Sequence, residues 1–152
     1  MSLRARTAVA AVVAVITAAT GYAGAAAGRQ GRIEPLGPDP VTVVVDIEHS
    51  RFTPSQLSVR QGTAVRFVVR NADPINHELI VGPDDVHDRH RNGTEAEHGA
   101  VPGEVSVPAL QRGVTTFTFD EVGVVAMACH LPGHYDYGMR GDITVVPLAS
   151  TG

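Results

Sequence analysis

The stretch ACHLPGHYDYGM, residues 128–139, contains the only cysteine of this 152-residue chain, Cys129. Four residues separate Cys129 from His134, and four more separate His134 from Met139. A thiolate, an imidazole and a thioether form a soft donor set, which suits copper as it alternates between Cu(I) and Cu(II). Zinc sites in proteins use Cys, His, Asp or Glu ligands and not a thioether, so Met139 argues against a zinc site.

A blue-copper site takes one cysteine, two histidines and a weak axial methionine. The stretch 128–139 lacks only one of these, a second histidine, which has to come from a distant part of the chain. We favour His77, because it follows a turn and begins a short apolar stretch, so that its ring can point at the loop. The remaining candidates are His49, His87, His90 and His98.

The chain from Val41 onward has the residue pattern of β-strands. In residues 64–70 apolar side chains alternate with polar ones, so we expect Val65, Phe67 and Val69 to be buried and Arg66 and Arg70 to face water. The same reasoning predicts strands at 41–48, 56–59, 77–82, 104–107, 113–119, 124–129 and 142–147. About eight short strands with turns at roughly ten-residue intervals predict an all-β fold, a Greek-key β-sandwich, in a single domain at 41–148.

The N-terminus has the layout of a secretory signal peptide. Residues 1–6 are basic, an uncharged Ala- and Val-rich run covers 7–27, and small-residue cleavage sites lie within 23–27. An uncleaved anchor is the alternative, because the run just reaches the roughly 20 residues of a membrane span. We expect residues 1–27 to direct export to the periplasm, the cell surface or the medium, and residues 28–40 to form a tether.

Export makes the lone cysteine informative. Oxidising compartments favour paired cysteines, so an unpaired one indicates a reactive thiol or a metal ligand. Without residues 1–27, ten basic residues remain against 16 acidic ones, a net charge of −6. The chain has no basic stripe for nucleic acid, and we expect membrane contact only if the N-terminal segment is retained.

Residues 83–103 are polar and contain three histidines, His87, His90 and His98, with Glu95 and Glu97 nearby. Histidine-rich tracts can bind metal, so these three could form a second metal site. A solvated polar loop, with one helical turn at most, is the interpretation that we favour.

The stretch Cys129–Met139 resembles the ligand loop of the cupredoxins, small blue-copper proteins such as plastocyanin, azurin and rusticyanin. Its spacing of four and four is most similar to the rusticyanin-like and sulfocyanin-like members. The lead-in to His77 also resembles the family, through Phe52-Thr53-Pro54, Gly62, Val65-Arg66-Phe67 and Asn71. The resemblance implies a cupredoxin sandwich with a single type 1 copper ion and four ligands: His77, Cys129, His134 and Met139.

The resemblance also implies a function. Cupredoxins carry one electron at a time, and the second loop histidine reaches the surface through an apolar patch where redox partners dock. In this chain that histidine is His134, and the patch comprises Leu131, Pro132, Gly133 and Tyr135. We therefore expect an exported, monomeric electron carrier that is not an enzyme.

Two positions depart from the family pattern. Glu78 follows the first histidine, where Asn or Ser is common, and Ala128 precedes the cysteine, where an aromatic residue is common. If the family geometry holds, the backbone N–H of Glu78 still donates to the sulfur of Cys129.

Two other functions are alternatives to electron transfer. Copper delivery, storage or resistance without a redox cycle would use the histidines of residues 83–103. An enzyme with Cys129 as its nucleophile would give Met139 no role, and nucleophilic cysteines usually find their histidine far away in the sequence.

Overall fold

The computed structural model describes residues 35–37, 40–93, 98 and 101–148. The predicted signal peptide, residues 1–27, and the first part of the predicted tether lie outside these residues. Within the described ranges, no helix has both the length and the apolar character that crossing a membrane requires.

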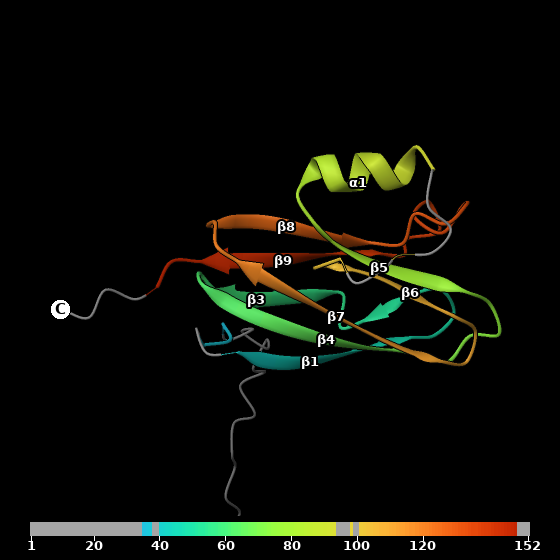
Figure 1. Ribbon diagram of the computed structural model, residues 1–152, viewed down its shortest axis with the longest axis horizontal. Coiled ribbons are helices and arrows are strands. Elements are labelled where there is room, and N and C mark those ends of the chain that lie inside the picture. Colours follow the sequence, from blue (N-terminus) through green and yellow to red (C-terminus); the bar gives the residue numbers. More distant parts are fainter. Residues whose placement is uncertain (1–34, 38–39, 94–97, 99–100, 149–152) are drawn as a thin grey trace, which may run out of the picture. The chain divides into compact units, whose positions relative to one another are not determined.

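Nine strands in the described residues form two sheets, so the predicted β-sandwich is confirmed (Figure 1). The four-stranded sheet has the order β2-β1-β4-β7, with β1 (Val41–Ile47), β2 (Phe52–Thr53), β4 (Thr63–Asn71) and β7 (Arg112–Phe119). The five-stranded sheet has the order β3-β9-β8-β5-β6, with β3 (Gln56–Arg60), β5 (His77–Gly82), β6 (Glu104–Val107), β8 (Gly123–Ala128) and β9 (Arg140–Val146).

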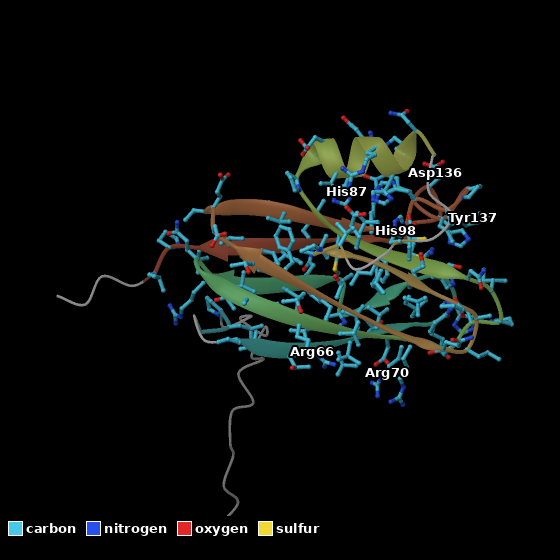
Figure 2. All side chains as sticks on the ribbon, viewed as in Figure 1. Arg66, Arg70, His87, His98, Asp136 and Tyr137 are labelled. Atoms are coloured by element: carbon cyan, nitrogen blue, oxygen red, sulfur yellow. The ribbon has the colours of Figure 1, made fainter. Side chains whose placement is uncertain are left out.

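The predicted alternation of β4 is confirmed. Val65, Phe67 and Val69 are fully buried, while Arg66 and Arg70 are exposed on the outer face of the four-stranded sheet (Figure 2). Residues from both sheets form one core, in which the ring of Phe67 meets the ring of Phe119 edge-on with centroids 6.5 Å apart. The core therefore fixes which face of each strand is internal, because a shift by one residue would expose the whole apolar set.

The strand pairing is mixed rather than purely antiparallel. β1 pairs in parallel with β4, and β3 pairs in parallel with β9. These parallel partners are far apart in the sequence, so the pattern of each strand predicted its existence but not its neighbour.

The prediction of a solvated polar loop at 83–103 is wrong for its first part. Residues Asp84–Arg91 form the helix α1, which lies outside the five-stranded sheet near β5 and β8 (Figure 1). Acidic residues in its first turn and basic residues in its last turn suit the helix dipole. Its buried residues include two histidines, His87 and His90, so a pattern of aliphatic residues could not reveal its inner face.

The helix explains why β5 is buried on both faces. All six residues of β5 are buried, although a strand at the surface of a sandwich normally alternates. One face of β5 meets the core and the other lies beneath α1, which leaves a polar compartment between helix and sheet.

Candidate metal centre

Three predicted ligands come together at one end of the sandwich. His77 begins β5, Cys129 directly follows β8, and His134 lies in the loop between β8 and β9. One donor atom from each of these residues lies within 4.8 Å of the other two. Nδ1 of His134 is 3.1 Å from Nδ1 of His77 and 3.3 Å from Sγ of Cys129. The structure thus brings the distant histidine to the two loop donors.

The loop closes on itself around Met139. The N–H of Cys129 donates to the carbonyl of Met139 at 3.1 Å, and the N–H of Met139 donates to the carbonyl of His134 at 3.0 Å. Gly133 and Gly138 have φ values of +82° and +94°, which side-chain-bearing residues rarely adopt. Met139 is fully buried in the same core cluster as Cys129. Its role as the axial ligand stays a prediction.

Asp73 holds the ring of His77. Its Oδ2 lies 2.9 Å from Nε2 of His77, so the proton on Nε2 is donated to the carboxylate and Nδ1 is left to face the centre. The same carboxylate accepts hydrogen bonds from the N–H groups of His49 and Ser50. Burial by itself would raise the pKa of Asp73, but these N–H groups and the ring of His77 hold the pKa below its ordinary value.

The sulfur of Cys129 lies in an apolar interior. Burial raises the pKa of this thiol to about 12, although the backbone N–H groups of Glu78 and Leu131 donate to the sulfur and oppose the shift. The Glu78 contact is the one that the family geometry implied. Burial also lowers the pKa of His77, so its ring is neutral near pH 7 and available as a ligand.

The donor set fits a copper ion. Two neutral imidazole nitrogens and a sulfur converge, with a methionine buried beside them, and these are the donors that a blue-copper site uses. Backbone N–H groups directed at the sulfur would stabilise a thiolate once a metal displaces its proton.

The raised pKa of Cys129 predicts that its thiol reacts slowly with thiol reagents in the metal-free protein. At pH 8 the thiolate fraction should be roughly 1000-fold below that of a thiol with the ordinary pKa of 9.0, because the pKa is raised to about 12. Stopped-flow labelling with a disulfide reagent should therefore be slow at pH 8 and should accelerate up to pH 11. Rapid stoichiometric labelling at pH 8 would show that the thiol is ionised.

The contact between Asp73 and His77 predicts a loss of metal affinity in Asp73→Asn. We expect copper affinity to fall about 10- to 100-fold, because the carboxylate fixes the tautomer and direction of the ring. Competition with a chelator measures this change. Asp46→Asn is a matched control, since Asp46 pairs with Arg70 on the outer face of the other sheet. Equal affinities of the two variants would contradict the positioning role.

The other histidines lie elsewhere. His49 is exposed, and Nδ1 of His87 is 2.9 Å from Nε2 of His130, on the opposite side of β5 and β8 from the core. His90 and His98 lie against Glu104 and Glu78. His130 alternates away from Cys129 as expected, and Met127 is a fully buried core residue as expected.

Sequence reasoning missed Asp73, Glu104 and the role of the Glu78 side chain, since only the backbone N–H of Glu78 was predicted to make a contact. Asp73 belongs to the turn before His77 and precedes that histidine by four residues. Glu78 and Glu104 lie in strands otherwise interpreted from their apolar residues. For the two glutamates, the signal that was available is a charged residue in a short strand whose other residues are mostly apolar.

The surface near His134 is partly apolar. Leu131 and His134 are half-buried, and Pro132 and Gly133 are exposed. Tyr135 stacks on His130 with ring centroids 5.5 Å apart, and the guanidinium of Arg140 lies over its ring. Tyr137 is 72% exposed at the outer end of the loop (Figure 2). Tyr135 is therefore a packing residue, while Tyr137 faces solvent.

Residues 40–146 match the family described as copper binding proteins, plastocyanin/azurin family. The chain belongs to this family. It is a cupredoxin, as its ligand loop had indicated, and a copper-binding protein.

Individual relatives of this cupredoxin include the copper-resistant cuproprotein CopI of Rubrivivax gelatinosus, 34% identical over 105 residues. The match covers 67% of this chain and 64% of that protein, so the chain spans less than two thirds of the relative's length. Among solved structures, auracyanin B is 26% identical with a TM-score of 0.58, over 70% of this cupredoxin and 89% of that chain. Auracyanin A of Chloroflexus aurantiacus, 22% identical with a TM-score of 0.57 over 70% and 99% of the two chains, shares the fold.

Proposed function

We propose that this cupredoxin is an exported, non-enzymatic carrier of single electrons, with copper held by His77, Cys129, His134 and Met139. The observation that carries the proposal is the convergence of Nδ1 of His77, Sγ of Cys129 and Nδ1 of His134 within 4.8 Å. Bound copper would supply the redox change between Cu(I) and Cu(II).

The protein's contribution is to hold the donors still. Asp73 fixes the ring of His77, and the hydrogen bonds between Cys129, His134 and Met139 fix the loop. A site whose donors are fixed by the surrounding fold needs little rearrangement when its charge changes, and this favours rapid electron exchange.

The electron would enter and leave near His134. Its half-buried ring lies beside the partly exposed Leu131 and the exposed Pro132 and Gly133, which form a small patch without charge. Small interfaces of this kind suit the brief contacts of redox proteins. We propose a redox protein as the partner at this patch.

The test is a visible spectrum and a voltammogram of the copper-loaded protein. We expect an intense blue absorption and reversible reduction through many cycles without loss of copper. A colourless protein, or one that loses its metal on each reduction, would contradict the proposal.

A second candidate function is copper handling without a redox cycle. It is favoured by the likeness to a relative named a copper-resistant cuproprotein, at 34% identity. Incubation of the Cu(I) form with a chelator or a metal-free acceptor protein separates the two functions. Transfer of copper within minutes favours handling, whereas retention of copper together with fast electron exchange favours the carrier.

Export is part of the proposal. The residues that carry the predicted signal peptide lie outside those described, so export rests on their sequence alone. Mass spectrometry of the protein from the periplasm or the medium of its producing cells should show an N-terminus between residues 24 and 28.

A further inference from the structure

A second group of donor side chains lies in the polar compartment between α1 and the five-stranded sheet. One donor atom from each of Glu78, His90 and His98 lies within 4.8 Å of the other two. Their side chains are 4%, 3% and 0% exposed. Nε2 of His98 is 2.9 Å from Oε2 of Glu78, and the rings of His90 and His98 meet edge-on with centroids 4.4 Å apart. These contacts join a strand, a helix and a loop.

Glu104 supports the same group from β6. Its Oε2 lies 3.0 Å from Nε2 of His90 and 3.6 Å from Nδ1 of His98, and its other oxygen accepts from Arg89. Carboxylates that contact metal-binding histidines orient the ring and raise its basicity. Glu104 is therefore a positioning residue for His90, at a side-chain exposure of 3%.

The charge of the compartment favours a cation. Two buried carboxylates lie in the compartment: Glu78 contacts His98, and Glu104 contacts His90. Among the described residues, Arg89 is the one arginine that forms an ion pair with either of them, and it pairs with Glu104. Burying carboxylates without compensation is costly. A dication between Glu78, His90 and His98 would neutralise the remaining charge and use the imidazole nitrogens as ligands.

This group is separate from the Cys129 centre but is built on the same backbone. Successive residues of a strand face opposite sides, so His77 faces the first centre while Glu78 faces the second group. Cys129 and His130 diverge in the same way, and Oε1 of Glu78 accepts the N–H of His130 at 2.7 Å. The two groups share no donor side chain.

A pocket borders the second group. It has a volume of about 480 Å³, and its lining includes Glu78, His98, Ser106 and Leu131. A metal site needs a route from solvent as well as its ligands. The pocket borders the group on the side of Glu78 and His98, whose side chains are 4% and 0% exposed.

We propose that Glu78, His90 and His98 bind a second metal ion, a divalent transition metal such as Zn(II) or Cu(II). Two imidazoles and one carboxylate suit these ions of borderline softness, and the lack of sulfur in the group disfavours Cu(I). This site replaces the predicted set of His87, His90 and His98, because His87 pairs with His130 instead. It stands independently of the electron-transfer proposal.

The test uses Zn(II) on the full-length protein whose first centre already holds copper. After incubation with Zn(II) and desalting, we expect one zinc per chain by elemental analysis, with the blue absorption unchanged. An unchanged absorption shows that zinc has not displaced the copper. Absence of bound zinc in the wild-type protein would overturn the proposal.

Two histidines of α1 provide matched variants. His90→Gln should lower zinc affinity by about 100-fold or more, because it removes a proposed ligand. His87→Gln, one turn earlier and also buried, should leave zinc affinity close to the wild-type value. Retained blue absorption shows that each variant is folded. Loss of zinc from His87→Gln with retention in His90→Gln would overturn the assignment.

The double variant Cys129→Ser, His134→Gln distinguishes this proposal from the first. It lacks both loop donors of the first centre, yet it should still bind one zinc per chain, as shown by competition with a chelator. If the wild-type protein is not blue but this variant binds zinc, the electron-transfer proposal fails and the second site stands. If the variant binds none, the second site fails.

Discussion

Cys129→Ser should abolish the blue absorption completely while the β-sandwich stays folded. The absorption of a blue-copper site comes from the copper–thiolate bond, and Cys129 is the only cysteine of the chain. The fully buried sulfur would be replaced by a hydroxyl, which we expect to lower the free energy of unfolding of the metal-free protein by about 1–3 kcal/mol. Such a loss leaves a typical domain folded. Visible absorption of the copper-loaded protein and circular dichroism of the metal-free protein measure the two effects.

Met127→Leu is the matched control for Cys129→Ser. Met127 is fully buried in the same core cluster and also contributes a sulfur atom, but it is not one of the proposed ligands. Its replacement keeps the side-chain volume, so the variant should remain blue and lose little stability. A blue Cys129→Ser protein would refute the ligand assignment, as would a colourless Met127→Leu protein that is folded and contains copper.

Gly141→Ala should strongly destabilise the fold. A Cβ at this position would lie 2.0 Å from the carbonyl oxygen of Ser55 and 2.7 Å from the methyl group of Met127. The contact cannot relax easily, because the same carbonyl accepts the N–H of Asp142 and thereby helps to join β9 to β3. We expect the free energy of unfolding to fall by about 3 kcal/mol or more, measured by urea denaturation.

Gly37→Ala is the control for this substitution. A Cβ at Gly37 meets no atom within 4 Å, so the free energy of unfolding should change by less than about 1 kcal/mol. Both variants add one methyl group, which meets other atoms within 4 Å at Gly141 but not at Gly37. Similar stability of both would show that β9 can shift away from Ser55 at little cost.

Much of the first centre could be predicted from the sequence, because three of its proposed ligands are close neighbours in the chain. The spacing of Cys129, His134 and Met139 is a local property, and the nature of their donor atoms indicates copper directly. The place of His77 at the start of a strand distinguishes it from the other histidines, and the structure brings its Nδ1 to 3.1 Å from Nδ1 of His134. The core positions of β4 followed from simple alternation.

The sequence by itself determined the donor chemistry and the class of fold, since both depend on residue type and on short-range periodicity. Tertiary structure decided the polar contacts, because the partner of a buried charge depends on which distant residue the fold places opposite it. Asp73 became the support of His77 in this way, and α1 brought His90 over β5 to meet Glu104 and His98. The buried face of α1 consists of histidines, so its sequence shows no apolar periodicity. Only the tertiary structure shows that residues 84–91 cover a second cluster of donor side chains and do not form a solvated loop.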